Sequence, residues 1–518
     1  MADRYVLALD VGTQSARAIV FDAGGALVAR AQVAFTPYHS AAPGWAEQDV
    51  EVYWAALRDS CHTLWNEAGV DPANIEAVSL TTQRGSVVCV DERGEALRPA
   101  ILWLDKRVQP GLGNVPGPWG WLFRTLGVHE TIAQFRADAE SNWLQAHQPA
   151  LWQRTRRFLF LSGYLTHRLT GHFRDSVGCQ VGYVPFSYSQ QQWAHRWDWK
   201  WKAVCVRPDQ LPELVPPGQS LGGLTTAAAG ELGLPEGLPL VAAAGDKACE
   251  VLGSGALSSD VACLGYGTTA TINTVSEKYR EVIRYLPAYP AAVPGHYNTE
   301  IQIFRGFWMV SWFKQEFGAP EEQIAASTGL PTEAVLDQQI RDIPAGSQGL
   351  MLQPYWSPGI RDPGPEAKGA IIGFSDVHTR AHVYRAILEG LAYALRHGRE
   401  KIERTTRQPV RRLRVAGGGS QSDVAMQITA DVFGLPAERP HVYEASALGA
   451  AINAAVGTGM HPDYRTAVRA MTHVGDVFEP EPAAVRTYDR LYTRVYERMY
   501  GRMKPLYRQL RRTTGYPP

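Results

Sequence analysis

The stretch Tyr5–Asp22, with the sequence YVLALDVGTQSARAIVFD, contains two runs of apolar and β-branched residues on either side of a short polar turn. This pattern predicts a β-hairpin whose turn spans residues 12–15. Backbone N–H groups and hydroxyls in such a turn suit phosphate oxygens, and the neighbouring carboxylate of Asp10 can hold Mg²⁺ directly or through water. Taken by itself, the stretch also fits an ordinary surface hairpin.

A second hairpin of the same kind is predicted about half the chain further on. Residues 260–264, DVACL, lead into the turn Gly265–Thr269 and then into residues 270–274, ATINT. The repetition favours a duplicated domain, with two turns that face each other across one nucleotide and each hold part of its phosphate chain. The second copy has no acid at the position of Asp10, so it supplies only amides and hydroxyls.

A third segment, residues 413–422 with the sequence LRVAGGGSQS, predicts a short strand that ends in three glycines. A predicted helix follows over Asp423–Phe433. The glycines let backbone and nucleotide approach closely, and a helix N-terminus adds partial positive charge. The segment lacks the Gly-Lys-Ser/Thr ending of a Walker A loop, and no Rossmann fingerprint follows a strand. A flexible loop is the alternative.

Length and composition fit two globular domains. The chain has 518 residues, of which 45% are hydrophobic and 20% are charged, enough for two separate cores. Lys plus Arg and Asp plus Glu total 51 each, so no overall charge favours nucleic acid. The six cysteines show no paired metal spacing, and no apolar run approaches membrane-spanning length. We therefore expect a cytoplasmic protein without nucleic-acid or membrane partners, and formation of a homodimer stays open.

These segments together resemble the FGGY family of carbohydrate kinases, in the actin-like ATPase superfamily, and its xylulose and glycerol kinases in particular. Any one motif is weak, but their order and spacing over nearly the whole chain are specific. The motifs that carry the resemblance are Leu9–Thr13 with Arg17, Thr82–Arg84, Ile101–Arg107, Gly245–Asp246, Tyr266–Thr268, Gly369–Gly373, Arg380–His382, Glu389–Gly390, Gly417–Gly419 and Glu444–Ala451.

The resemblance implies an α/β fold of two ribonuclease H-like (actin-like ATPase) domains, with mixed five-stranded sheets flanked by helices and a cleft between them. It implies transfer of the γ-phosphoryl group of ATP, with Mg²⁺, to a hydroxyl of a small sugar or polyol. The residues then expected to bind the ATP phosphates are Gly12, Thr13, Gln14, Arg17, Gly267 and Thr268. The residues expected to bind adenosine are Gly417, Gly418, Gly419 and Ser422.

Asp246 is the expected catalytic base. It follows the apolar run Leu240–Gly245, which predicts a strand that delivers a carboxylate to the edge of the cleft. A carboxylate is a competent base because the alcohol loses its proton only as its bond to phosphorus forms. An Asp after a strand is otherwise a helix cap. The neighbouring Lys247 has three possible roles, which are to lower the pKa of Asp246, to contact an acidic group of the substrate, or to point away.

Sugar contacts are expected mainly from the first domain. Arg84 can donate a fork of hydrogen bonds to vicinal hydroxyls, and Trp103 offers a flat face to a carbon skeleton. A solvent-exposed ion pair for Arg84 and a core position for Trp103 are the alternatives. The complete set expected to bind the substrate is Gln83, Arg84, Trp103, Asp105, Asp246 and Lys247, with Glu300 and Gln302 as weaker candidates from the second domain.

The substrate pocket departs from two familiar patterns. Glycerol kinases carry Gln-Arg-Glu where this chain has Gln83-Arg84-Gly85, and Tyr where it has Phe135. The loss of two polar contacts disfavours glycerol, and Gly85 opens volume for a longer substrate. Xylulose kinases have Gln-Met-His at the same loop. We expect a ketose such as a pentulose, with glycerol or another polyol as the alternative. A non-catalytic sugar sensor and an actin-like ATPase are alternatives of another class.

Three regions are predicted along the chain. Residues 1–250 form an N-terminal domain with the first phosphate turn, the sugar loops and the base. Residues 251–475 form a C-terminal domain with the second turn and the adenosine motif, and residues 476–518 form a terminal helix packed on the body. Within the first domain the pattern also predicts a strand near residues 25–35, a helix over residues 50–68 and an irregular segment over residues 110–120.

Overall fold

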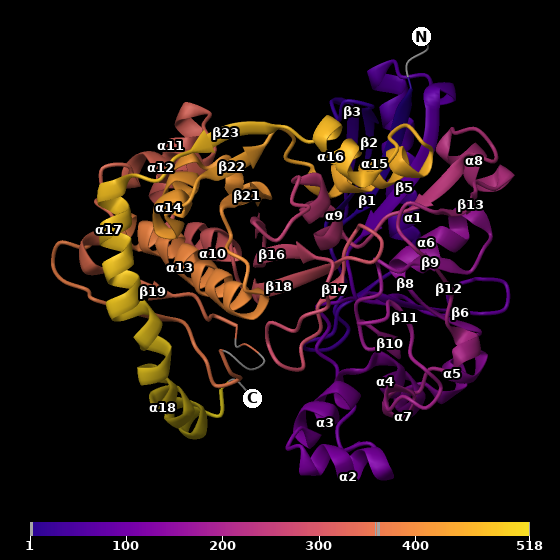
Figure 1. Cartoon of the computed structure of the whole chain (residues 1–518), viewed down its shortest axis with the longest axis horizontal. Helices are drawn as coiled ribbons and strands as arrows, with labels where there is room; N and C mark the ends of the chain where they lie inside the picture. Colours follow the sequence, from indigo (N-terminus) through magenta and orange to yellow (C-terminus); the bar gives the residue numbers. More distant parts are fainter. Residues whose placement is uncertain (1–3, 358, 360–362, 517–518) are drawn as a thin grey trace.

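The computed structural model of the chain describes residues 4–357, 359 and 363–516. The outer ends of the first and last predicted regions, residues 1–3 and 517–518, lie outside this part. Figure 1 shows two lobes side by side, each built around a β-sheet with helices against it. The first lobe contains the N-terminal strands and the second contains most of the chain after α9. The predicted α/β class is confirmed.

The first lobe is organised by a sheet with the strand order β13-β14-β5-β1-β2-β3. Its strands are β1 (Tyr5–Val11), β2 (Ser15–Asp22), β3 (Leu27–Ala34), β5 (Ile75–Thr82), β13 (Ser220–Gly223) and β14 (Pro239–Ala242). The β1–β2 pair is the predicted antiparallel hairpin, and β5 runs parallel to both β1 and β14. The carboxyl ends of β1, β5 and β14 therefore meet at one edge of the sheet, where the first turn and the residues after β5 and β14 lie.

Alternate residues of β1 enter two different cores. Leu7 and Leu9 belong to the core that includes residues of α1, whereas Val6 and Ala8 belong to the core that includes residues of α15. Because successive side chains of a strand point to opposite faces, a strand covered on both faces is apolar throughout. The continuous apolar run of the hairpin therefore reflects a sheet buried between two layers of helices.

The second lobe repeats this topology. Its sheet has the order β17-β18-β16-β15-β21-β22-β23. The strands are β15 (Val261–Tyr266), β16 (Ala270–Ser276), β17 (Tyr289–Pro290), β18 (Tyr297–Ile303), β21 (Arg412–Ala416), β22 (Ala437–Pro440) and β23 (Val474–Phe478). The hairpin β15–β16 continues antiparallel into β18, while β21 and β22 run parallel to β15. Its central strands β18-β16-β15-β21-β22 correspond in order to β3-β2-β1-β5-β14 of the first sheet, as the predicted duplication requires.

The expected five strands per sheet are extended at the edges. Among the described residues the first sheet has six strands and the second has seven. The additions are β13 in the first sheet, and β17 and β23 in the second, and each pairs antiparallel with its neighbour. These edge strands are short or largely exposed, with sequences such as SLGG in β13 and VGDVF in β23. Such segments lack the continuous apolar pattern that marks a central strand.

Smaller strands and helices complete the first lobe. A small sheet contains β4 (Glu47–Gln48), β6 (Val87–Val90), β7 (Ala100–Ile101) and β8 (Arg157–Phe160), and the short pairs are β9 (Arg174–Ser176) with β12 (Glu213–Val215) and β10 (Phe186–Ser187) with β11 (Gln192–Trp193). The helices are α1 (Val50–Ala68), α2 (Pro118–Thr125), α3 (His129–Asp138), α4 (Glu140–His147), α5 (Pro149–Arg154), α6 (Leu161–Thr170), α7 (Lys200–Ala203), α8 (Thr226–Leu232) and α9 (Asp246–Gly253).

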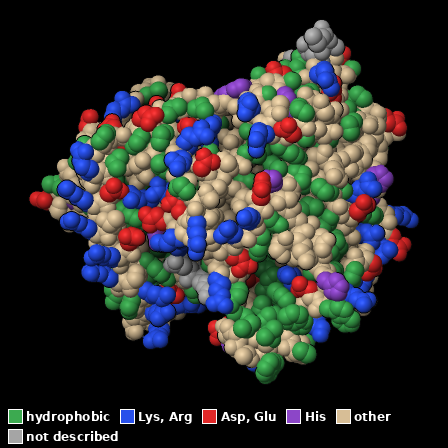
Figure 2. All heavy atoms as spheres, in the orientation of Figure 1, with side chains coloured by type: hydrophobic (Ala, Val, Ile, Leu, Met, Phe, Trp, Pro, Cys, Tyr) green, Lys and Arg blue, Asp and Glu red, His purple; other side chains and the backbone are tan. Residues whose placement is uncertain are grey.

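Of two sequence predictions for the first lobe, one agrees with the observed bounds and one does not. The helix predicted over residues 50–68 coincides with α1, and its first turn is capped by Asp49, which accepts a hydrogen bond from the backbone of Glu51. The irregular segment predicted over residues 110–120 ends earlier than expected, because α2 begins at Pro118. Proline is well placed at the start of a helix, where its missing N–H has no partner to lose. Trp121 and Leu122 of α2 are exposed, and Figure 2 shows hydrophobic side chains gathered at the lower edge of the molecule, where Figure 1 places α2.

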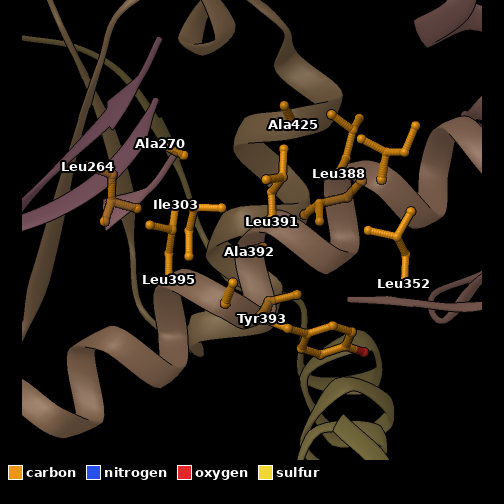
Figure 3. Close-up of a cluster of buried hydrophobic side chains, with 14 of the residues drawn as sticks. Leu264, Ala270, Ile303, Leu352, Leu388, Leu391, Ala392, Tyr393, Leu395 and Ala425 are labelled. Carbon is orange, nitrogen blue, oxygen red and sulfur yellow. The ribbon is translucent and has the colours of Figure 1, made fainter. Parts of the chain in front are cut away.

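The second lobe has a large core around one long helix. Its helices are α10 (Trp308–Phe317), α11 (Ala319–Thr328), α12 (Thr332–Ile340), α13 (Arg380–Thr406) and α14 (Asp423–Phe433), with the strand pair β19 (Met351–Gln353) and β20 (Ala370–Ile372). Figure 3 shows Leu388, Leu391 and Leu395 of α13 directed at one cluster with Leu264 of β15 and Ile303 of β18. This apolar layer fixes α13 against the second sheet.

Two helices late in the sequence pack on the first lobe. These are α15 (Ala445–Gly457) and α16 (Tyr464–Met471), which follow β22. Residues of α15 share a buried cluster with Val6 and Ala8 of β1, and α15 packs closely on α9 (Figure 1). The boundaries predicted at residues 250 and 475 stay a prediction, but the region between them is not one compact body. The chain crosses from the second lobe to the first after β22 and returns before β23.

The C-terminal segment is helical and packs on the second lobe. It comprises α17 (Pro482–Leu491), one π-helical turn over Tyr492–Tyr496 and α18 (Glu497–Thr514). Tyr488, Tyr492 and Tyr496 are buried in the same core as α13. Helical structure thus spans residues 482–514, with the π turn between α17 and α18. Over the described ranges, every helix is too short or too polar to cross a lipid bilayer.

Candidate active site

The first phosphate turn is tied to the expected sugar loop. The turn between β1 and β2 is closed by a hydrogen bond from the Gly12 N–H to the Ser15 carbonyl, 3.0 Å long. The Thr13 hydroxyl donates to Oε1 of Gln83 at 3.0 Å and accepts from the indole N–H of Trp103 at 3.2 Å. Gln14 is exposed beside them. Residues that the sequence assigned separately to phosphate and to sugar therefore form one hydrogen-bonded group.

Asp10, the expected metal ligand, is nearly buried and paired with Arg17. Nη1 of Arg17 donates to Oδ2 of Asp10 at 3.0 Å, and the Asp10 side chain is 7% exposed. Burial raises the pKa of Asp10 to about 6, although the guanidinium of Arg17 opposes this shift. Arg17 also lies 3.6 Å from Glu444, which in turn pairs with Arg30 at 2.7 Å. Glu444 directly precedes α15, so the late crossing segment contributes to this site.

The residues around Asp10 fit a magnesium ion. Carboxylate oxygens are the ligands that Mg²⁺ prefers, and it usually keeps several waters. Among the described residues, Arg17 donates only to Oδ2, which leaves Oδ1 of Asp10 as an available oxygen ligand. A Cβ on Gly12 in the neighbouring turn would meet only the carbonyl oxygen of Ser15, at an ordinary contact distance of 3.6 Å, so the turn is not closely packed at this point.

The second turn lies between β15 and β16. Its carbonyl groups are occupied, because the N–H of Gly306 donates to Thr268 at 2.9 Å and the N–H of Phe307 donates to Gly267 at 3.0 Å. The Thr268 side chain is exposed. The turn is therefore held from behind by the segment that begins α10, and its hydroxyl remains at the surface.

The three glycines of the expected adenosine site have different roles. Gly417 has a φ of +87°, and a Cβ there would lie 2.9 Å from the backbone of Tyr266. A Cβ on Gly419 would lie 2.4 Å from the ring of Phe307. Gly418 faces open space. Ser422 caps α14, because its hydroxyl accepts a hydrogen bond from the N–H of Ala425 at 3.0 Å. Packing thus explains Gly417 and Gly419, and helix capping gives Ser422 a structural role that the sequence interpretation did not include.

Asp246 is the first residue of α9, directly after the strand β14 and a short connection. Oδ1 accepts a hydrogen bond from the N–H of Lys247 at 2.7 Å. Asp246 therefore also serves in part as a helix-capping residue, which was the alternative role. Its negative charge is favourable at the N-terminus of α9. The side chain is nevertheless 33% exposed, so its carboxylate stays accessible to a substrate.

Arg84 and Glu300 connect the two lobes beside Asp246. Arg84 follows β5 of the first lobe, and its Nη2 donates to Oε1 and Oε2 of Glu300 on β18 at 3.1 and 3.2 Å. Nε of Arg84 lies 3.7 Å from Oδ1 of Asp246. The guanidinium also lies over the ring of Tyr289, 5.4 Å from its centroid. The alternative of a solvent-exposed ion pair does not apply to Arg84, whose side chain is largely buried.

The remaining expected sugar residues divide into two groups. Trp103 is 46% exposed and therefore presents its ring to the solvent, not to a core. Asp105 has a structural role instead of a free carboxylate. Arg107 binds both of its oxygens, at 2.8 and 2.7 Å, and the N–H of Ala46 donates to Oδ2 at 2.6 Å. The Asp105 carboxylate has no oxygen to spare for a sugar, which corrects its expected role.

Lys247 is paired within its own helix. Its Nζ lies 3.2 Å from both carboxylate oxygens of Glu250, one turn later in α9. The pair packs against β15, where a Cβ on Gly265 would lie 2.4 Å from Oε1 of Glu250 and 3.3 Å from Nζ. The lysine is thus directed at the strand that leads into the second phosphate turn.

Two residues of this site were missed or underrated in the sequence interpretation. Glu300 was ranked below the first-domain residues, and Glu444 was quoted only as part of a family motif. Each one contacts an arginine of the first lobe from a segment far along the chain. A signal for Glu300 exists in β18, because it is the one charged residue of this strand and lies between the buried residues Thr299 and Ile301.

The comparisons with known proteins agree with this geometry. Residues 5–253 match the N-terminal domain of the FGGY family of carbohydrate kinases, and residues 262–458 match the C-terminal domain of the same family. The chain belongs to the FGGY family of carbohydrate kinases. Enzymes of this family are phosphotransferases with an alcohol group as acceptor, and the family implies ATP as phosphoryl donor and a small sugar or polyol as substrate.

Individual relatives cover nearly the whole chain. It is 29% identical over 497 residues to an uncharacterized sugar kinase of Escherichia coli K12, with 95% of this chain and 92% of that protein aligned. It is 31% identical over 505 residues to a glycerol kinase of Dechloromonas aromatica, with 94% and 95% aligned. The crystal structure of a xylulose kinase from Rhodospirillum rubrum superposes with a TM-score of 0.79 at 27% identity, covering 98% of this chain and 100% of that one.

These findings confirm the expected actin-like two-domain fold and the kinase class. They also set aside the two alternatives of another class, the non-catalytic sugar sensor and the actin-like ATPase, because the family consists of carbohydrate kinases. The relatives include kinases named for different substrates, among them a glycerol kinase and a xylulose kinase.

Proposed function

We propose that this enzyme transfers the γ-phosphoryl group of ATP to a hydroxyl of a ketose, most simply a pentulose. The observation that carries the reaction is the Asp246 carboxylate, which is a third exposed and lies beside Arg84, the arginine that pairs with Glu300 of the second lobe. In the proposed reaction Asp246 accepts the proton of the attacking hydroxyl as the new bond to phosphorus forms. The resemblance to a xylulose kinase structure at 27% identity supports the choice of a ketose.

The other residues receive positioning and charge-stabilising roles in this proposal. The turn residues Gly12, Thr13 and Gln14, with Arg17, hold phosphate oxygens from the first lobe, and Gly267 and Thr268 hold them from the second. The adenosine lies against the three glycines Gly417, Gly418 and Gly419. A magnesium ion held by Asp10, directly or through water, neutralises charge on the phosphates when it is bound. Contacts from both lobes hold the phosphate chain so that the attacking hydroxyl and the γ-phosphoryl group are aligned.

The shape of the sugar pocket supports a substrate longer than glycerol. Gly85 has a φ of +70°, and a Cβ there would be in ordinary contact with Trp103, 3.6 Å from its Cβ. A glutamate at this position would therefore occupy space beside the exposed indole ring. Phe135 contributes no polar group and packs against Tyr183 and Trp199, with ring centroids 5.3 and 5.4 Å away. The two polar contacts expected for a triol are absent from these positions.

A substrate panel tests this proposal. ADP production is measured in a coupled assay with pentuloses, hexuloses, polyols and sugar acids, each with ATP and Mg²⁺. We expect the largest kcat/KM with a pentulose and a much lower value with glycerol, because an unmatched polar contact costs specificity. Glycerol is kept as the second candidate because a glycerol kinase is 31% identical to the chain. A kcat/KM for glycerol equal to or above that of every ketose would contradict the proposal.

A further inference from the structure

We propose that Glu300 is a positioning residue that withholds Arg84 from Asp246 while the two lobes are in contact, so that the base is available only in the closed enzyme. The proposal rests on the assignment of Asp246 as the base. It adds a link between lobe closure and catalysis that uses a residue of the second lobe.

The distances show which carboxylate holds the guanidinium. Nη2 of Arg84 is within hydrogen-bonding distance of both oxygens of Glu300, at 3.1 and 3.2 Å. Its Nε is 3.7 Å from Asp246, beyond normal hydrogen-bonding distance. Arg84 is thus shared between an acid of each lobe and makes its hydrogen bonds to Glu300.

Burial and anchoring explain why Glu300 holds the arginine. The Glu300 side chain is 3% exposed, whereas that of Asp246 is 33% exposed. An ion pair is stronger where water is excluded. Gln302 donates to Glu300, and the regular pairing of β18 with β16 fixes the backbone position. A rigid, desolvated acceptor holds the guanidinium in preference to an exposed one at the end of a helix.

The path of Arg84 makes a switch between the two acids easy. Its side chain passes directly over Gly245, where a Cβ would lie 2.6 Å from Cγ of Arg84. The arginine stem therefore runs along the residue that precedes Asp246. With Glu300 removed, a small rotation of the guanidinium would bring it into hydrogen-bonding distance of the base.

Several charged or titratable groups act on Asp246 from the surrounding elements. Asp10 on β1, Arg84 after β5 and Lys247 on α9 act on it, as do the buried thiols of Cys179 and Cys249. Glu250, Tyr289 and Glu300 act in turn on Arg84 or Lys247. The charges of Arg84 and Lys247 are each matched by a glutamate. Among the described residues, Glu250, Glu300 and Asp246 are the carboxylates paired with these two cations, and Asp246 is the one that lies beyond hydrogen-bonding distance, at 3.7 Å.

Lobe opening then has a chemical consequence. Glu300 belongs to the second sheet, whereas Arg84 and Asp246 both belong to the first lobe, so separation of the lobes would carry Glu300 away from them. When the lobes separate, Arg84 loses its partner and the remaining nearby carboxylate is Asp246. A cation paired with a carboxylate favours its charged form and makes it a weaker base. The open enzyme is thereby kept from activating a hydroxyl before the nucleotide and sugar are enclosed.

The first test is Glu300→Gln, which keeps the shape of the side chain and removes its charge. We expect kcat to fall about tenfold, a fraction of the usual contribution of a general base. The KM for ATP should change by less than about twofold, because the phosphate turns are untouched. The acid limb of the kcat/KM profile should move to lower pH, since Arg84 then stabilises ionised Asp246. A purely structural role would not move this limb.

A double mutant decides whether Glu300 acts through Arg84. In an Arg84→Met background, which keeps an apolar stem over Gly245, adding Glu300→Gln should cause no further loss of kcat. An equal loss in both backgrounds would overturn the proposal, because Glu300 would then act directly on the substrate. An unchanged kcat in the single mutant would overturn it as well.

Two controls separate this inference from the proposed function. Glu277→Gln removes an exposed acid of the same lobe and should leave the pH profile unchanged. Asp246→Asn must abolish sugar-dependent ADP production. If it does not, the assignment of the base fails. If it does, while Glu300→Gln behaves like the wild type, only the coupling to Glu300 fails. Melting temperatures of all variants identify any that do not fold.

Discussion

Lys247 follows the proposed base directly, and its ammonium group is committed to Glu250. Of its possible roles, contact with an acidic substrate therefore has the least support, since the charge already has a partner. Burial lowers the pKa of Lys247, but the carboxylates of Glu250 and Asp246 outweigh this effect and raise it. The lysine thus stays charged, and with Glu250 it forms a neutral pair between α9 and β15.

Replacement of Lys247 by alanine should lower kcat/KM by the same factor for neutral sugars and for sugar acids. It should also destabilise the protein by about 3 kcal/mol, because Glu250 is left as a buried, unpaired charge. Thermal unfolding and parallel kinetics on both substrate classes measure these effects. The double variant Lys247→Ala with Glu250→Gln should recover most of the stability. A selective loss with sugar acids would show instead that the lysine contacts a substrate carboxylate.

At the level of single residues, sequence patterns predicted positions better than partners. Asp10, Thr13 and Asp246 were predicted because each stands next to a strand end or a turn in a local pattern. Asp105 was misassigned because the sequence does not show that Arg107, two residues later, folds back onto its carboxylate. Glu300 was underrated because its value depends on Arg84, which is close only after the two lobes come together.

At the level of elements, glycines determine how closely α9 and α15 pack. A Cβ on Gly449 would lie 1.9 Å from the carbonyl oxygen of Cys249, and one on Gly253 would lie 2.0 Å from that of Ala445. Backbone atoms cannot yield to such contacts as a flexible side chain can. The helix that carries Asp246 is therefore fixed by a close contact with the crossing segment.

Gly449→Val should destabilise the protein by about 3 kcal/mol or more, because overpacking against backbone forces the helices apart. Gly501 offers a matched control. It lies in the exposed interior of α18, where a Cβ would meet no atom within 4 Å. Gly501→Ala should be neutral or stabilising by about 0.5–1 kcal/mol. Denaturant unfolding of both variants tests the contrast, and a Gly449→Val protein as stable as the wild type would contradict this account of the packing.

The hairpins and the helices α1 and α14 could be predicted from the sequence, whereas the edge strands and the crossing helices could not. Continuous apolar runs identify strands covered on both faces, and β1, β2 and β15 have such runs. The edge strand β23 is exposed and carries no comparable pattern. The apolar character of α15 predicts burial, but periodicity does not tell which of two sheets a helix covers. The sequence analysis therefore places α15 in the second domain, whereas the helix packs on the first lobe.

At the level of the whole molecule, two lobes joined by crossing segments should close around nucleotide and sugar. The Arg84–Glu300 pair and the α9–α15 contact link the two parts of the chain. Closure excludes water and limits wasteful ATP hydrolysis.

Small-angle scattering tests this motion on the full chain. The radius of gyration should fall when a nonhydrolysable ATP analogue and the preferred sugar are added together, and it should fall less with either ligand alone. Glu300→Gln should show the same final value, because its proposed role is chemical and not mechanical. A radius that does not change with both ligands would contradict a large closure.

The central claim is that Asp246 takes the proton of the phosphorylated alcohol, and the activity of Asp246→Asn tests it most directly. The amide keeps nearly the same shape but cannot act as the base. We predict that sugar-dependent ADP production falls by at least about a hundredfold, while calorimetry shows unchanged ATP binding and the melting temperature stays close to that of the wild type. Normal turnover by Asp246→Asn would contradict the account.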